Sequence, residues 1–212
     1  MMNRKERFLE IYDRTIQRPG AEDLKAFLER SDFFTAPASS KHHLAETGGL
    51  IQHSMNVYDR LNQFLGAEYV HESPYTEETI AIVALLHDLC KVNTYKQDWK
   101  NQKTYDLEKV SGAYPGNVKH DSRGPYIWES VPAYTIDEKF IYGHGEKSVY
   151  IIRSFMDLSP EEATAIRFHM GPWQEGEGRN AGAVFSKNPL AFFLHMADEA
   201  ATFLDETEGP AT

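Results

Sequence analysis

Cysteine is nearly absent from this chain: Cys90 is the only one among 212 residues. No disulfide can therefore form within the sequence, and nothing marks an oxidising compartment. Long apolar runs are absent too, since no stretch approaches the roughly 20 apolar residues of a membrane-spanning helix. Residues 1–14 are charged and amphipathic and lack the apolar stretch of a signal peptide. We expect a cytoplasmic protein that does not enter the membrane.

Positive charge is also scarce. Lys and Arg number 22 against 32 Asp and Glu, which gives a formal net charge of −10. Affinity for long nucleic acid depends on many Lys and Arg contacts with phosphate, so this balance argues against such a partner. It leaves open a local basic pocket for a small phosphorylated substrate. With 41% hydrophobic residues and no internal repeats or obvious linkers, residues 1–212 are expected to form a single domain.

Apolar residues at helical spacing predict helices on both sides of an irregular middle segment. The predicted helices lie within residues 1–30, 46–65, 76–91, 160–170 and 188–206, with one more beginning after Gly143. Residues 173–187 read as a glycine-rich loop. The expected fold class is all-α: a helical bundle whose core comprises residues 41–91 and 140–206.

The middle segment, at about residues 92–139, has a different composition. It combines aromatic residues, glycine, proline and scattered charge, and residues 99–103 resemble a turn between two short strands. We expect a small β-rich or irregular insertion. Six of its aromatic residues could stack on a nucleotide base, pack on one another or form a homodimer interface. They are Tyr95, Trp99, Tyr105, Tyr126, Trp128 and Tyr134.

Two polar residues, His87 and Asp88, close the apolar run Ile80–Leu86. Burying an imidazole or a carboxylate without a partner costs several kcal/mol, and a metal ion would be a partner for both. His53 and Asp198 pose the same problem, because each lies on the apolar face of its own predicted helix. Mixed imidazole and carboxylate ligands suit Mn, Fe, Co, Ni or Mg better than they suit a thiolate zinc site.

A structural role is the competing interpretation for each of these residues. An inward histidine is more often a hydrogen-bonded core residue than a metal ligand. The same dipeptide also recurs at His120-Asp121, in a polar loop that we interpret as surface. The metal interpretation depends on the order of the polar residues and on their shared apolar setting. Cys90 is not expected to be a ligand, because it has no cysteine partner and follows the pair away from the stripe that carries His53.

The order of these residues resembles the HD superfamily of metal-dependent phosphohydrolases, whose all-helical core supplies metal ligands as His, His-Asp and a late Asp. The matching segments are GGLIQHS at residues 48–54, LLHDLCK at 85–91 and HMAD at 195–198. The resemblance implies an HD-domain helical bundle in which His53, His87, Asp88 and Asp198 bind metal.

Two further histidines occupy positions where one branch of this superfamily binds a second metal. They are His144, in GHGEKS, and His169, in RFHMG. The resemblance then implies one or two divalent ions, with Asp88 able to bridge them. The alternative makes His144 a helix-start residue and His169 a favourable charge in the last turn of a helix.

The segment around His42-His43 is similar to HD-type 3′→5′ exoribonucleases, which normally carry an additional nucleic-acid-binding domain for which this chain has no room. We therefore expect His43, and also His195, to support metal ligands rather than to bind metal. Lys91 lies one predicted turn beyond His87 on the same face, from which its ammonium could reach substrate phosphate. The alternative is a lysine placed favourably at a helix C-terminus. The family pattern has glycine where Cys90 stands, which puts close backbone packing there in doubt.

The function that this resemblance implies is metal-dependent hydrolysis of a phosphate ester or anhydride by a metal-activated water. A nucleotide or another small phosphorylated molecule is the expected substrate, with Asp88 and Lys91 as catalytic residues and Lys91 also binding substrate. Two alternatives stay open. The same ligands could hold two irons in an HD-fold oxygenase that uses O₂, or the chain could be a non-catalytic ligand-binding module that retained the fold.

Overall fold

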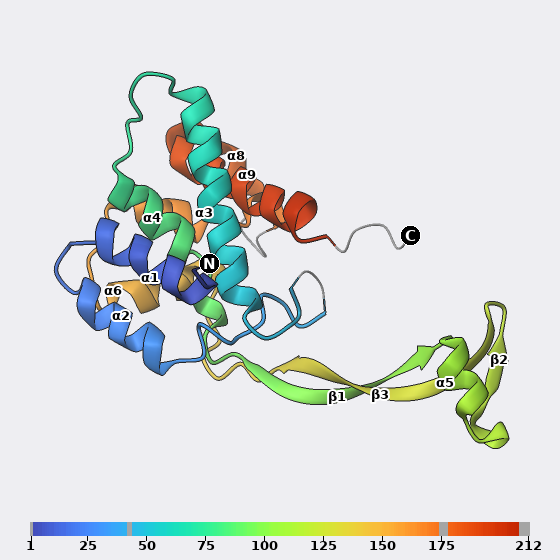
Figure 1. The fold of residues 1–212 in the computed structure, drawn as a ribbon. Helices are drawn as coiled ribbons and strands as arrows, with labels where there is room; N and C mark the ends of the chain where they lie inside the picture. Colours follow the sequence, from blue (N-terminus) through green and yellow to red (C-terminus); the bar gives the residue numbers. More distant parts are fainter. Residues whose placement is uncertain (1, 42–43, 174–177, 208–212) are drawn as a thin grey trace.

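A computed structural model describes residues 2–41, 44–173 and 178–207, which form a helical body with one projecting β arm (Figure 1). The helices of the body are α1 (Arg4–Thr15), α2 (Ala21–Arg30), α3 (Gly49–Glu68), α4 (Glu77–Leu86), α6 (His144–Arg153), α7 (Pro160–Arg167), α8 (Ala181–Lys187) and α9 (Pro189–Ala200). A π-helical segment, Ala201–Asp205, extends α9. In the described part of the chain, no helix combines the length and apolarity needed to cross a membrane.

Local sequence signals explain where several helices begin. Asn3 and Glu6 form a capping box at the start of α1, and Ser159 and Glu162 form another at the start of α7. In each box, two backbone N–H groups that lack a helical partner are satisfied by side chains. Pro160, the first residue of α7, has no N–H to satisfy and a φ angle already suited to a helix.

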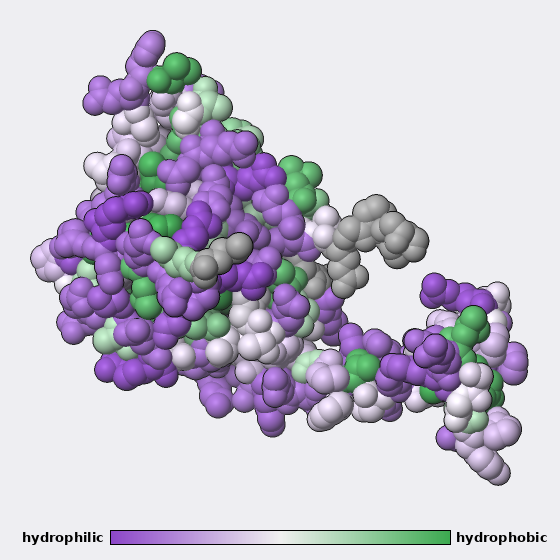
Figure 2. All heavy atoms as spheres, viewed as in Figure 1, coloured by the Kyte–Doolittle hydropathy of each residue, from purple (hydrophilic) through white to green (hydrophobic). Residues whose placement is uncertain are grey.

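The core lies where α3 packs against α4 and α9. Every residue of the run Ile80–Leu86 in α4 is buried, so this helix is surrounded on all sides. Fully burying a large aliphatic side chain contributes about 1.5–3 kcal/mol, and Leu85 and Leu61 are among the largest side chains buried here. Polar side chains cover most of the outer face of the body seen in Figure 2.

A two-stranded ribbon forms the arm. Strand β1 (Tyr95–Thr104) pairs antiparallel with β3 (Gly124–Ile136), and short β2 (Lys119–Asp121) pairs with the start of β3, giving the order β1-β3-β2. Helix α5 (Leu107–Gly112) lies at the tip, far from the helical body (Figure 1). Along much of its length the ribbon is open to solvent, and Trp99 is 68% exposed.

This sheet overturns the all-α fold class. The protein is mostly helical but mixed, because a three-stranded antiparallel sheet occupies the middle of the chain. The turn expected at residues 99–103 is also wrong, since these residues lie inside β1 and pair with 128–132 of β3. The alternation that reveals a strand arises when one face is buried. Most of β1 is exposed on both faces and has no such pattern, and its polar middle therefore resembled a turn.

Candidate metal centre

The apolar helix α4 stops immediately before the His87-Asp88 pair. It ends at Leu86, His87 keeps helical angles, and Asp88 departs from them at φ −103° and ψ 21°. Residues Leu89–Lys91 then form a 3-10 turn, so the continuous helix expected over 76–91 is wrong. At this break His87 and Asp88 are both buried, close to residues from α3, α6 and α9.

Backbone carbonyls orient two of the buried histidines. The Nδ1 of His87 donates to the carbonyl oxygen of Ala84 at 2.8 Å, and the Nδ1 of His169 donates to that of Ile166 at 2.6 Å. A neutral imidazole that donates from Nδ1 carries its lone pair on Nε2. Metal-binding histidines in proteins are commonly held by such a partner on the other ring nitrogen. Both rings therefore present Nε2 as a ligand atom.

His53, on α3, is held by a carboxylate instead. Its Nδ1 donates to Glu206, at 3.0 Å from Oε1 and 3.2 Å from Oε2, and its Nε2 faces His87 Nε2 at 3.2 Å. Two lone pairs at this separation would repel each other, so the contact needs a proton or a metal ion. Burial lowers the pKa of His53, but hydrogen bonds to Asp198 and Glu206 outweigh it and raise that pKa to about 9. Burial lowers the pKa of His87 to about 4. A proton on His53 Nε2 or a bound metal ion would remove this repulsion.

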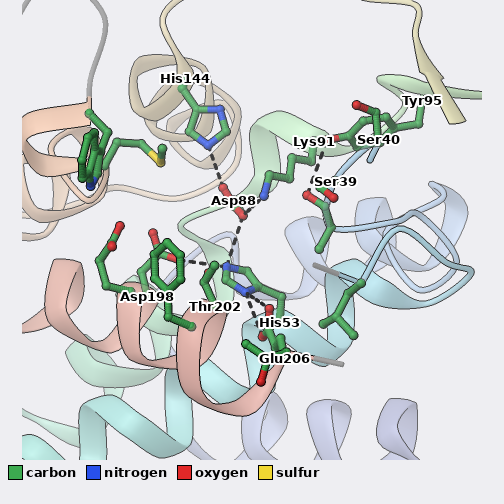
Figure 3. A pocket seen from close by; sticks show the side chains of 17 residues that line it. Ser39, Ser40, His53, Asp88, Lys91, Tyr95, His144, Asp198, Thr202 and Glu206 are labelled. Atoms are coloured by element: carbon green, nitrogen blue, oxygen red, sulfur yellow. Dashed lines mark hydrogen bonds and ion pairs between the residues drawn. The ribbon is translucent and has the colours of Figure 1, made fainter. Parts of the chain in front are cut away.

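The two carboxylate oxygens of Asp88 face different histidines, and Figure 3 shows Asp88 lying between His144 and His53. Oδ2 is 3.5 Å from His53 Nε2 and 3.6 Å from His87 Nε2. Oδ1 is 2.9 Å from His144 Nε2 and 3.6 Å from His169 Nε2. Asp88 is therefore placed as a bridge between two neighbouring sets of ligand atoms.

The remaining carboxylate comes from α9. Asp198 Oδ1 lies 3.1 Å from His53 Nε2. The ligand atoms form three overlapping groups, each with its atoms within 4.8 Å of one another. The groups are His53 with His87 and Asp198; His87 with Asp88 and His169; and Asp88 with Cys90 and His144. All six residues predicted as metal ligands are thus brought together from five separate stretches of chain.

A lysine places positive charge next to the Asp88 carboxylate. Lys91 Nζ lies 2.6 Å from Asp88 Oδ2. Burial works to raise the pKa of the Asp88 carboxyl, but Lys91 and the surrounding imidazoles hold it well below its usual range. Burial likewise lowers the pKa of Lys91, and Asp88 reverses this, so that the ammonium stays charged.

A cavity of about 900 Å³ opens onto this cluster and is lined by His53, Asp88, Lys91, His144 and Asp198. His87 and His169 lie behind these residues and have no exposed surface. The cavity is also lined by Leu44, Tyr95, Met170, Trp173 and Phe203. His53, Asp88, His144 and Asp198 therefore border a space large enough for a small molecule.

One buried atom of the cluster is left unsatisfied. His169 Nε2 has no hydrogen-bond partner among the residues that the structure describes. Leaving a buried acceptor unsatisfied costs about 1–3 kcal/mol, and a cation beside Asp88 would remove that cost. The set of imidazole nitrogens and carboxylate oxygens also matches the ligands of first-row divalent ions. The residues present therefore fit a metal ion.

No family model matches the chain, and the comparisons with curated proteins and with solved structures gave no match either. The similarity to the HD superfamily therefore stands on the order of residues within this chain, and it stays a prediction.

Residues outside the cluster contact its ligands. His195 Nδ1 donates to the backbone oxygen of His169 at 2.8 Å, and its ring stacks on Phe185. This places His195 next to a ligand segment, where a supporting residue would lie. His43, for which we predicted a similar role, is outside the described residues.

Glu206 was missed at the sequence level, although it contacts His53 directly. It follows Asp198 by eight residues, about two helical turns further along, and this spacing was the available signal. The structure also places Cys90 beside the cluster, although we did not expect it to be a ligand. Its Sγ is 3.4 Å from His144 Nδ1 and 3.8 Å from Asp88 Oδ1.

Proposed function

We propose that this protein is a metal-dependent phosphohydrolase of the HD type, acting on a nucleotide or another small phosphorylated molecule. One observation carries the proposal. Three buried imidazole Nε2 atoms, from His53, His87 and His169, lie around the two oxygens of Asp88, and His53 and Asp88 line an open cavity. A purely structural polar cluster has no need of such an opening.

A divalent ion bound here would lower the pKa of a bound water molecule from near 16 to about 7, which supplies a nucleophile at neutral pH. Asp88 lines the same cavity, where its carboxylate would accept a hydrogen bond from that water and orient it. His144 lines the cavity and remains partly exposed, so when it holds no metal ion it can donate a proton to a leaving oxygen. These roles require both residues to face one substrate, and both do line the same space.

Lys91 supplies positive charge in the same cavity. Its ammonium contacts Asp88 and lines the cavity, where it can stabilise the charge that develops on phosphoryl oxygens. Met170, Trp173 and Phe203 line the same cavity and offer apolar surface for the organic part of a substrate. A phosphate at Lys91 with a flat ring against this surface describes a nucleotide better than inorganic phosphate.

The test begins with metal analysis of protein purified without chelators. Phosphate release from nucleotides, sugar phosphates and model diesters is then measured with added Mn²⁺, Co²⁺, Ni²⁺ or Mg²⁺. We expect metal-dependent turnover that His87→Ala abolishes and His120→Ala leaves unchanged. The second variant is a matched control, because it alters the exposed copy of the same dipeptide. Bound iron with O₂-dependent turnover and no phosphate release would show an oxygenase, and protein that retains no metal would contradict the metal site.

A further inference from the structure

The only cysteine of the chain lies against the cluster. Cys90 Sγ is 3.4 Å from Nδ1 and 3.6 Å from Nε2 of His144, and it is 3.8 Å from Asp88 Oδ1. Oδ1 is also the oxygen that contacts His144, at 2.9 Å. Cys90 Sγ, a ring nitrogen of His144 and Asp88 Oδ1 therefore lie within 4 Å of one another. The other oxygen of Asp88, Oδ2, is the one near His53.

The backbone holds the thiol in this position. The N–H of Cys90 donates to Ser148 Oγ at 2.9 Å, and its carbonyl accepts from Thr94 Oγ1 at 2.9 Å. Ser148 lies one turn after His144 on α6, and α6 packs against the 3-10 turn that carries Cys90. Ligands positioned by their surroundings bind metal with little reorganisation. The thiol and the imidazole are thus set by the same pair of elements.

A second, independent feature points at the same place. His169 Nε2 is fully buried, lies 3.6 Å from Asp88 Oδ1 and has no hydrogen-bond partner among the described residues. Its ring is 5.2 Å from that of His144, measured between centroids. A buried nitrogen without a hydrogen-bond partner among the described residues, next to Asp88 Oδ1 and close to the ring of His144, is a position for a cation.

We propose that Cys90 is a metal ligand, and that Asp88, Cys90, His144 and His169 form a sulfur-containing site beside the nitrogen- and oxygen-only site of His53, His87 and Asp198. This inference rests on the proposed metal chemistry and deepens it. On binding, the S–H bond breaks, its proton passes to solvent and a sulfur–metal bond forms.

The separations suit a tetrahedral ion. Bonds of about 2.3 Å to sulfur and about 2.0 Å to nitrogen at a tetrahedral angle place the two ligand atoms about 3.5 Å apart. Cys90 Sγ and His144 Nε2 are 3.6 Å apart. Thiolate favours Zn²⁺ and other softer ions, whereas Mg²⁺ requires oxygen ligands. The site should therefore prefer Zn²⁺, Co²⁺ or Fe²⁺ over Mg²⁺.

Cobalt titration of the metal-free full-length protein tests this directly. Wild type is expected to develop the near-ultraviolet sulfur-to-cobalt charge-transfer band, and Cys90→Ser to lose it while still binding Co²⁺ with weaker visible bands. Loss of an outer partner already lowers metal affinity about 10- to 100-fold, so Zn²⁺ affinity should fall by at least that factor at this site. Mg²⁺ affinity should stay unchanged.

The outcomes separate this inference from the proposed function. Cobalt binding to wild type without the charge-transfer band would overturn the role of Cys90 and leave the proposed function standing. No cobalt binding at all would overturn both. A further measurement needs no variant: because the chain has a single thiol, its alkylation reports Cys90 alone. Zn²⁺ should slow that alkylation, and unchanged alkylation with Zn²⁺ bound would contradict the inference.

Discussion

His53 and Glu206 are separated by 153 residues, yet the imidazole Nδ1 of one donates to the carboxylate of the other at 3.0 Å. Asn56 donates to the same carboxylate at 2.9 Å, which fixes its position. The contact determines which nitrogen of His53 faces Asp88 and Asp198. A residue at the end of the described chain therefore controls a ligand on α3.

Glu206→Gln should weaken metal binding about 10- to 100-fold, because the partner that holds His53 loses its charge. Competition with a chromophoric chelator measures the affinity. Asp205→Asn is the matched control, since the neighbouring Asp205 pairs with Arg60 on the more exposed side of the segment. Equal affinities for wild type and Glu206→Gln would show that this carboxylate does not serve the metal.

Asp88→Asn should abolish both metal retention and turnover. The change preserves the size of the side chain but removes the charge that bridges the two groups of histidines. Metal content after gel filtration and phosphate release are measured on the same sample, with circular dichroism to check folding. Asp121→Asn, in the arm, alters the other His-Asp copy and should leave both unchanged. A folded Asp88→Asn protein with full activity would show that Asp88 is neither a metal ligand nor a catalytic residue.

Lys91→Met should keep the metal and lose activity. Its ammonium contacts Asp88 but belongs to none of the groups of candidate ligand atoms, so we expect turnover to fall about 10²- to 10³-fold, as for other groups that stabilise developing charge. Steady-state kinetics and metal analysis together provide the test. Lys100→Met, on the exposed arm, is the control. Loss of metal in Lys91→Met would instead indicate that Lys91 serves to stabilise the cluster.

Stability at low pH should depend on Glu162, which anchors the α1–α2 connection to α7. Burial works to raise the pKa of this carboxyl, but Arg18, the Ser159 N–H and Thr79 outweigh burial and lower it. Because its folded pKa lies below the unfolded value of about 4.3, the stabilisation is complete above that value and is lost as pH falls through the folded pKa.

Glu162→Gln should therefore reduce the free energy of unfolding at pH 7 by about 2 kcal/mol, less than for a fully buried ion pair because Arg18 is partly exposed. Urea unfolding at pH 7 and pH 3 measures the free energy of unfolding of both proteins. The difference between wild type and Glu162→Gln should be smaller at pH 3. Glu161→Gln, at the exposed neighbouring position, should show neither effect. If the difference in unfolding free energy does not change with pH, the lost stability comes from packing of the Glu162 side chain rather than from its charge.

The arm should be dispensable for folding and metal binding. Its strands pair mainly with each other, and Asp98 lies opposite Ala133. Replacing residues 99–132 with Asn-Gly, which favours a tight hairpin turn, should leave the melting temperature and metal content of the body close to those of wild type. Substrate preference is the readout that would reveal a role in binding. An unfolded body would show that the arm supports the core.

Local patterns in the sequence were sufficient for most of the helices. The apolar run Ile80–Leu86 predicted a buried helix, and His53 was correctly placed among apolar residues, because a 3.6-residue period reports which face of a helix is inward. The same periodicity predicted that Asp198 lies on the inward face of its helix, and Asp198 is buried. These predictions succeeded because each depended only on residues within a few turns of one another.

Other features depended on contacts that no local pattern records. The break after Leu86 ends the helical period, and residues 96–103 of β1 show no alternation because they are exposed on both faces of the strand. Helix α8 was hidden in a segment read as a glycine-rich loop. The predictions of a helix over 76–91, a turn at 99–103 and a loop over 173–187 were therefore wrong.

By itself, the sequence determined that His53 and Asp198 would be buried on the apolar faces of their helices. Only the tertiary structure decided that Glu206 holds His53, that the two oxygens of Asp88 face different histidines, and that Cys90 lies against His144. The physical reason is that burial of a side chain follows from local periodicity, whereas its partners are chosen by packing between segments distant in the chain.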